Sequence, residues 1–158
     1  ATPSTCSIDS LVGRSLEGAG VPLGCPQQAA ELLMLAEQQF EQGVMIWDSD
    51  TRQIYVIEHD GRWQAFDDTW TSEQPEIDPG LVPPAGLVQP KRGFGQGWRE
   101  QLGGPQAGIG WGIIEERAAD GWRQRFENGQ VFWLDPPGGM AYLLYDDGTW
   151  EAVTVGRP

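Results

Sequence analysis

The sequence predicts a mainly β protein (β-rich α+β), in which two four-stranded antiparallel meander repeats with short helices pack as one sandwich- or barrel-like domain. Three observations lead to this fold class. A motif of aromatic residues and glycines occurs twice, turn signals separate short apolar runs, and 158 residues with 39% hydrophobic content suffice for one core but not for two ordinary domains. We therefore expect residues 1–158 to form a single domain.

The duplicated motif defines the two halves of this domain. The first copy contains Phe40-Glu41-Gln42-Gly43, Trp47, Tyr55, Asp60-Gly61 and Trp63. The second copy, about 86 residues later, contains Phe126-Glu127-Asn128-Gly129, Trp133, Tyr142, Asp147-Gly148 and Trp150. Leu23-Gly24 and Ile109-Gly110 precede the two copies at the same spacing. We assign repeat 1 to residues 11–66 and repeat 2 to residues 93–153.

Two helices and four strands are expected in the first half. Apolar spacing predicts a short helix over 7–19, and the composition of 26–32, with a proline at its first position, predicts another. The four strands are expected at 34–41, 44–47, 53–58 and 62–66. Asp60 and Gly61 form the last hairpin turn.

A linker and the second meander follow. Residues 67–92 contain five prolines among acidic residues, which predicts an extended strap over the surface. We expect the glycine-rich run 93–97 to form a turn and residues 97–102 to form a short helix. Strands are expected at 122–126, 130–134, 141–145 and 150–153, with turns at Asn128 and Gly129 and at Asp147 and Gly148.

The eight tryptophans fall into two groups. Four of them occupy equivalent positions in the two copies and are expected in the core: Trp47, Trp63, Trp133 and Trp150. The other four have no aromatic equivalent and are the candidate binding residues: Trp70, Trp98, Trp111 and Trp122. Trp70 and Trp98 flank the linker, so they are the first candidates for stacking against a sugar ring.

Few residues could support catalysis. His59 is the only histidine and lies at a predicted turn, and no Gly-x-Ser-x-Gly motif is present. A glycosidase would need paired carboxylates such as Glu41 with Glu127, or Glu115 with Glu116. The first pair recurs because both residues precede a turn, and adjacent residues on a strand point to opposite faces. We assign no catalytic residue and expect a protein that is not an enzyme.

No metal or cofactor is expected. The acidic pairs lack the glycine and closing glutamate of a helix-loop-helix calcium site; they are Asp48 with Asp50, Asp67 with Asp68, and Asp146 with Asp147. Two cysteines and one histidine match no zinc pattern. Solvated turns are the simpler explanation of the acidic pairs.

The cysteines and the start of the chain bear on cellular location. Cys6 and Cys25 either close a disulfide that ties down the N-terminal region, which we favour, or remain two buried thiols. The chain begins at Ala1 with small polar residues, as expected after removal of a signal peptide, although a trimmed chain would begin in the same way. We expect a secreted protein, extracellular or on the cell surface.

The formal net charge of −13, with a single lysine, argues against nucleic acid and anionic lipid as partners. No apolar run approaches the length of a membrane span. The remaining partners are a glycan or other copies of the chain.

The motif also carries a resemblance to known sequences. Phe-Glu-x-Gly followed by Trp, Tyr and Asp-Gly-x-Trp resembles an uncharacterised secreted or surface module of Chloroflexota-type bacteria, over about residues 11–153. More distantly, Gly110, Trp111, Glu115 and the run from Phe126 to Trp133 are similar to Leu-Gly-Phe-Pro (LGFP) repeats, which implies association with bacterial cell walls. The chain lacks Leu-Gly-Phe-Pro itself, and neither resemblance implies a catalytic residue.

Three functions are therefore expected, in decreasing order. The first is a secreted, non-catalytic module that binds a cell-wall or extracellular polysaccharide through exposed tryptophans. The second is a structural subunit of an extracellular filament or surface assembly, joined through strand edges or the N-terminal arm. The third is a glycoside hydrolase that uses paired carboxylates.

Overall fold

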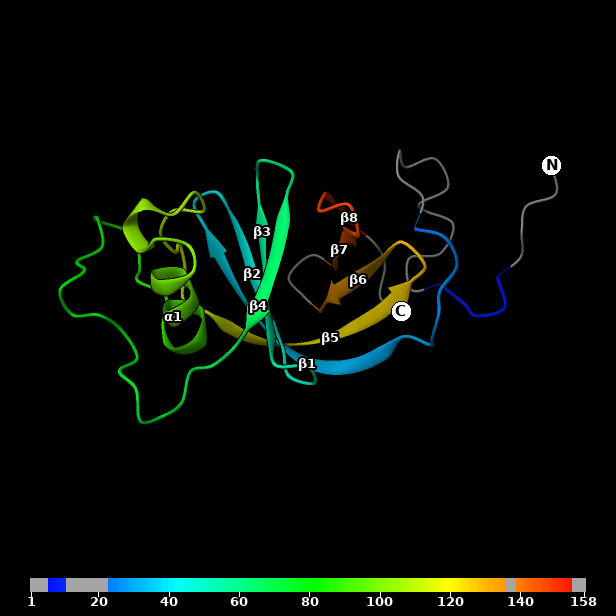
Figure 1. The fold of residues 1–158 in the computed structure, drawn as a ribbon, viewed down its shortest axis with the longest axis horizontal. Helices are drawn as coiled ribbons and strands as arrows, with labels where there is room; N and C mark the ends of the chain where they lie inside the picture. Colours follow the sequence, from blue (N-terminus) through cyan, green and yellow to red (C-terminus); the bar gives the residue numbers. More distant parts are fainter. Residues whose placement is uncertain (1–5, 11–22, 136–138, 155–158) are drawn as a thin grey trace. The chain divides into compact units, whose positions relative to one another are not determined.

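The computed structural model describes residues 6–10, 23–135 and 139–154 (Figure 1). The described elements are eight strands, one α-helix and one 3-10 helix, so the prediction of a mainly β fold is confirmed. The elements are β1 (Glu31–Phe40), β2 (Gly43–Asp48), β3 (Gln53–Glu58), β4 (Trp63–Asp67), α1 (Arg92–Glu100), η2 (Gly104–Gln106), β5 (Arg117–Phe126), β6 (Gly129–Leu134), β7 (Met140–Tyr145) and β8 (Trp150–Thr154). The strands of the first meander are hydrogen-bonded in the order β4-β3-β2-β1, and those of the second in the order β5-β6-β7-β8.

The chain divides into two compact units. The central unit is the continuous stretch Met34–Ala118, and the terminal unit combines Ala1–Leu33 with Ala119–Pro158. The central unit therefore contains most of the first meander together with the linker and α1. The terminal unit contains the N-terminal segment and the second meander.

In the central unit, β1 to β4 form the predicted antiparallel meander. Its core combines Met45, Ile54 and Val56 of the strands with Phe94 and Trp98 of α1. Figure 1 shows α1 beside these strands. Residues 68–91, between β4 and α1, contain no helix or strand, as expected for the proline-rich linker.

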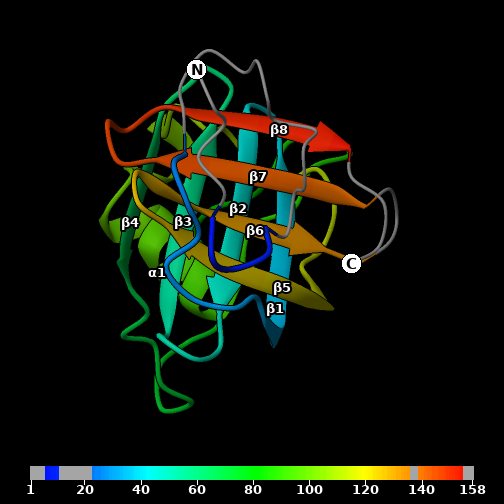
Figure 2. The ribbon, with the colours of Figure 1, turned by 90° about the vertical axis from the view of Figure 1, so that its right-hand side faces the viewer.

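In the terminal unit, β5 to β8 form the second antiparallel meander and lie side by side in Figure 2. The core contains buried side chains of these strands and one from the N-terminal segment: Leu23, Phe126, Val131, Trp133, Ala141, Leu143 and Tyr145. Those from β6 and β7 occupy every second position of their strands, so they lie on one face of the meander.

The leading segment of the first repeat packs on the hairpin of the second copy. The amides of Asn128 and Glu127 donate to the carbonyls of Leu23 and Cys25 at 2.9 and 3.0 Å. The Glu127 carboxylate completes the arrangement, because it accepts from the Cys25 amide at 2.8 Å. We call this set of backbone and carboxylate bonds the hairpin clasp.

The central unit contains an equivalent hairpin clasp. The amides of Gln42 and Glu41 donate to the carbonyls of Ile109 and Trp111 at 2.9 and 3.0 Å. The Glu41 carboxylate accepts from the Trp111 amide at 3.0 Å. Each unit thus joins the leading segment of one repeat to the meander of the other, so the repeat in sequence and the unit in space are different groupings.

The helix predicted over 26–32 is not present. Pro26 bridges to Phe126, the Gln27 amide donates to the carbonyl of Arg125 at 2.9 Å, and β1 already begins at Glu31. Pairing with β5 uses the backbone groups that a helix would need, so tertiary context overrides helix propensity. The helix predicted over 7–19 falls largely outside the described residues, and residues 7–10 are not helical.

The turn predicted at Asn128 and Gly129 is shifted by one residue. Phe126 pairs directly with Gly129, so the two-residue loop is Glu127 and Asn128, and Gly129 is the first residue of β6. A Cβ at Gly129 would lie 2.5 Å from the carbonyl oxygen of Leu144. Glycine is needed here because the backbones approach closely, and not because of the turn.

The glycine-rich run 93–97 was predicted to be a turn, but it is helical and belongs to α1. A Cβ at Gly97 would lie 2.2 Å from the Phe66 ring. The loss of helix propensity at these glycines is offset by close packing of the helix against β4. The helix predicted at 97–102 therefore exists, but it begins earlier, at Arg92, and ends at Glu100.

The four repeated tryptophans are less uniformly buried than predicted. Trp133 is buried, whereas Trp47, Trp63 and Trp150 are half-buried. Trp63 contacts Tyr55 and Trp150 contacts Tyr142, with ring centroids 6.1 and 6.3 Å apart. The repeated residues on the outer strands therefore form tyrosine–tryptophan pairs rather than core layers.

Candidate functional site

The central unit contains a pocket of about 480 Å³. Its wall combines apolar and aromatic side chains with charged and hydroxyl-bearing ones: Ala36, Trp47, Arg52, Ile54, Asp68, Trp70, Thr71, Ser72, Arg92, Gly93, Phe94 and Glu116. The residues come from β1, β2, β3, the turn between β2 and β3, the start of the linker, the first turn of α1 and the segment before β5. A concave apolar wall with a few polar groups is the usual form of a small-ligand site.

A small residue on β1 leaves room for this pocket. Ala36 lies opposite Trp47 in the β1–β2 register. In the terminal unit the corresponding pair is Trp122 opposite Trp133. An indole at the β1 position would cover the neighbouring tryptophan, so alanine leaves the Trp47 side chain partly open.

Trp70 is held in place at the pocket by two hydrogen bonds. Its backbone amide donates to Oδ1 of Asp68 at 3.0 Å, and its indole Nε1 donates to the carbonyl oxygen of Pro75 at 3.1 Å. The ring is half-buried and lines the pocket. Because its orientation is already fixed, a ligand that stacks on it would lose less conformational entropy on binding.

Two residues of the pocket wall carry buried polar atoms that lack a hydrogen-bond partner among the described residues. These atoms are Nε1 of Trp47 and Oε1 of Glu116. Glu116 is near Arg92, but the Nε to Oε1 distance of 3.6 Å exceeds a hydrogen bond. Burial raises the pKa of the Glu116 carboxyl, and the Arg92 charge partly opposes this increase.

Two arginines of the pocket wall have unusual backbone conformations. Arg52 has φ 57° and Arg92 has φ 54°, and they are the only non-glycine residues with positive φ in the described part of the chain. The residue that corresponds to Arg52 in the second meander is Gly139, also with φ 57°. A residue other than glycine is strained in this region, and such strain is concentrated at functional sites.

Of the four predicted binding tryptophans, only Trp70 lines this pocket. Trp98 is fully buried, and its indole Nε1 donates to the carbonyl oxygen of Gly110 at 2.8 Å. The prediction that Trp98 offers an exposed ring is therefore wrong, because α1 places this residue in the core of the central unit. Trp111 is half-buried and packs on Trp98 with ring centroids 5.0 Å apart, and Trp122 is half-buried against the terminal core.

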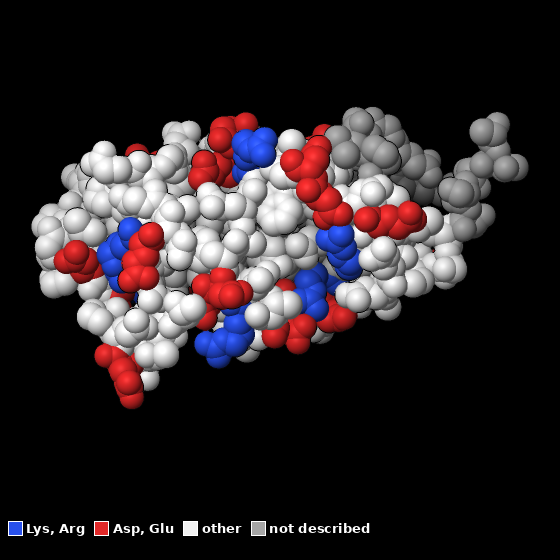
Figure 3. All heavy atoms as spheres, viewed as in Figure 1, with Lys and Arg blue, Asp and Glu red and all other residues white. Residues whose placement is uncertain are grey.

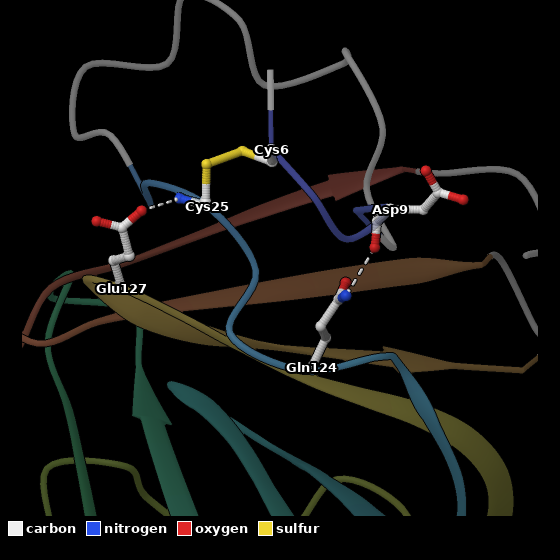
Figure 4. Close-up of a disulfide and its surroundings, with 5 residues drawn as sticks. All are labelled: Cys6, Asp9, Cys25, Gln124 and Glu127. Carbon is white, nitrogen blue, oxygen red and sulfur yellow. Dashed lines mark hydrogen bonds between the residues drawn. A yellow bond between two sulfur atoms is a disulfide. The ribbon is translucent and has the colours of Figure 1, made fainter. Parts of the chain in front are cut away.

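The predicted disulfide is present. Cys6 and Cys25 are bonded, with 5.4 Å between their Cα atoms (Figure 4). Figure 4 also shows Cys25 beside Glu127, and Asp9, whose carbonyl oxygen accepts from the Gln124 amide nitrogen at 2.8 Å. The disulfide therefore joins the N-terminal segment to the hairpin clasp of the terminal unit.

Of the predicted carboxylate pairs, one lies in the hairpin clasps and only one residue of the other lines the pocket. Glu41 and Glu127 each accept a backbone hydrogen bond in a hairpin clasp, which accounts for their recurrence. Glu115 forms an ion pair with Lys91 at 3.6 Å, whereas Glu116 lines the pocket. His59 is an exposed turn residue.

The acidic pairs act as turn residues. Oδ1 of Asp48 accepts from the amide of Asp50, Oδ1 of Asp68 from that of Trp70, and Oδ1 of Asp147 from that of Thr149. Within residues 6–10, 23–135 and 139–154, no group of three or more histidine, cysteine or acidic residues could hold a metal ion.

Sequence reasoning missed Trp47, Arg52 and Arg92 as pocket residues, and it named Glu116 only as one member of a carboxylate pair that it set aside. One signal was available, since Ala36 aligns with Trp122 and shows where one copy has lost a bulky residue. The remaining residues meet only after the linker and α1 return to the meander, which periodicity cannot predict.

Comparison with known proteins adds no assignment: no family model, no curated protein and no solved structure matches this chain. In the described part of the chain, no helix is both long enough and apolar enough to cross a membrane.

Proposed function

We propose that the protein is a secreted, non-catalytic binding module whose central-unit pocket binds a saccharide unit of a cell-wall or extracellular polysaccharide. The observation that carries this proposal is one pocket whose wall combines the indoles of Trp47 and Trp70 with charged and hydroxyl-bearing side chains. A sugar presents a C–H face that packs on an indole and hydroxyls that both donate and accept hydrogen bonds.

The pocket wall also carries side chains that can bond to sugar hydroxyls. The guanidinium groups of Arg52 and Arg92 can donate, and the carboxylates of Asp68 and Glu116 can accept. Thr71 and Ser72 add further polar groups to the wall. The Cys6–Cys25 disulfide supports secretion, because disulfides persist in oxidising compartments.

Binding to insoluble polysaccharides and purified cell walls tests the proposal. The Trp70→Ala variant should lose at least tenfold in affinity, about 1.4 kcal/mol, because the stacking surface is removed. Trp150→Ala is the matched control, since this half-buried tryptophan lies in the terminal unit and should leave binding unchanged. The melting temperature of each variant separates lost binding from lost folding.

Absence of binding to every glycan would contradict the proposal. It would favour the predicted structural subunit instead, and mass growth with concentration in light scattering would then be expected.

Glycoside hydrolysis is a second candidate, favoured by one observation. Burial raises the pKa of the Glu116 carboxyl, as a general acid requires, and Asp68 lies on the same wall. Release of reducing ends from a bound polysaccharide, abolished by Glu116→Gln, would support this function. Binding without turnover would contradict it.

A further inference from the structure

The two strained arginines of the pocket carry an inference about the ligand that rests on the proposed saccharide-binding function. We propose that the pocket selects an acidic saccharide, in which the carboxylate of a uronic acid unit is bound by the guanidinium groups of Arg52 and Arg92.

The first step concerns Arg52, whose conformation suits glycine better. Its backbone bonds do not depend on its side chain, since its amide donates to Asp48 and its carbonyl accepts from Asp68, at 2.8 and 2.9 Å. Gly139 adopts the same φ in the other meander without strain. An arginine that is unfavourable for the backbone is explained by a use of its side chain.

The second step concerns the absence of an internal partner. No ion pair or side-chain hydrogen bond within the described residues involves Arg52, although acidic residues outnumber basic ones 23 to 10 in the chain. On the face shown in Figure 3, basic side chains lie among acidic ones. An unpaired guanidinium at the pocket is therefore available for an acceptor from outside.

The third step concerns Arg92, the other arginine of the wall. Its guanidinium is only loosely engaged, at 3.9 Å from Glu76 and 3.6 Å from Glu116. A ligand carboxylate could replace these long contacts with shorter, charge-assisted hydrogen bonds. The planar fork of arginine matches a carboxylate in two-point contact.

The fourth step concerns the charge that the pocket tolerates. Asp68 and Glu116 lie on the same wall as the two arginines, so the local charges balance. A single ligand charge can be accommodated, whereas the double charge of a phosphate monoester would be repelled by these carboxylates and by the net charge of −13. The balance favours a sugar carboxylate over a phosphate.

The test compares acidic oligosaccharides with matched neutral ones by calorimetry. The probes are oligogalacturonate and oligomannuronate, each beside its carboxyl-reduced form. We expect the acidic form to bind at least tenfold more tightly at low salt, with this preference falling as salt is added.

Arg52→Gly is the decisive variant. It should abolish the preference for the acidic form while leaving the melting temperature unchanged or higher, because the strained arginine is replaced by the glycine of the other meander. Arg52→Lys should retain part of the preference. Arg62→Ala removes the same charge from an exposed turn outside the pocket and should bind like the parent protein.

The possible results are distinct. Equal binding of acidic and neutral forms that Trp70→Ala weakens would overturn the acidic-sugar inference and leave the proposed function standing. No binding of either form, together with no binding to any polysaccharide, would overturn both. A marked drop in the melting temperature of Arg52→Gly would also contradict the inference, since it would give the side chain a structural use.

Discussion

The central and terminal units contain the same hairpin clasp but hold its leading segment in place with different residues. Both attach a leading segment to a hairpin through a clasp, in which Trp111 and Cys25 hold equivalent positions. In the central unit Trp111 packs on the buried Trp98, whereas in the terminal unit Cys25 is bonded to Cys6. Trp111 is thus tethered by its contact with Trp98 of α1, whereas the equivalent Cys25 is tethered by a covalent bond. The pocket described above lies in the central unit, which has the aromatic tether.

The two units also differ in an ion pair, in which the acidic and basic residues have changed places. Glu31 pairs with Arg123 at 2.9 Å in the terminal unit, and Arg117 pairs with Glu37 at 3.1 Å in the central unit. The roles of acid and base are reversed between equivalent residues. The duplication has therefore preserved contacts more closely than residue identities.

Removing the aromatic tether should have the largest effect. Trp98→Ala empties a fully buried site and leaves the Gly110 carbonyl without its donor, so we expect a loss of about 3–5 kcal/mol in the free energy of unfolding. Chemical denaturation measures this loss. A loss below about 1 kcal/mol would show that the site collapses around the smaller side chain.

Removing the covalent tether should cost less. Reduction of the Cys6–Cys25 disulfide opens a loop with a sequence separation of 19 residues, for which we expect about 3 kcal/mol. Hydrogen exchange should show loss of protection in β5 to β8 and little change in β2 to β4. Equal loss in both meanders would contradict an effect confined to the terminal unit.

Filling the pocket with the residue of the other unit should affect binding more than folding. Ala36→Trp recreates the tryptophan pair that Trp122 and Trp133 form, so the strands can accept it. We expect at least a tenfold loss of saccharide affinity, about 1.4 kcal/mol, by calorimetry. Ala36→Ser, which keeps the residue small, is the control that should still bind.

The smallest effect is expected at Glu116, whose counterpart by repeat spacing is Ala30. Burial raises its pKa, so the folded state holds this proton more tightly than the unfolded chain does. The stabilisation by the protonated group is complete below the unfolded-state pKa and is lost as the pH rises through the folded-state pKa. Glu116→Gln should therefore remove this part of the pH dependence in thermal melts above pH 4.5. Unchanged curves would contradict the raised pKa.

The strands were predictable from sequence, whereas the pocket was not. Apolar runs, turn dipeptides and, for β1, alignment with the second copy located part of each of the eight described strands, but not the first residues of β1 and β5. Residues 26–32 were assigned to a helix because propensity is local, while their partners lie near Phe126. Trp98 was assigned to the surface because it has no repeated counterpart, yet α1 buries it. Positions at which the two copies carry different residues indicated where the units differ. They did not indicate whether the difference lies in the hydrophobic core or at a binding site.

The hairpin clasps have a consequence for the order of folding during synthesis. The central unit is complete once Ala118 has left the ribosome, because every segment that it needs has then been made. The segment that contains Leu23 and Cys25, although made before the central unit, meets its hairpin only after Glu127 and Asn128 have been made. Until then Cys6 and Cys25 can meet without the hairpin that holds Cys25 in place. The segment around Leu23 and Cys25 is thus made before the central unit but acquires its native contacts after it.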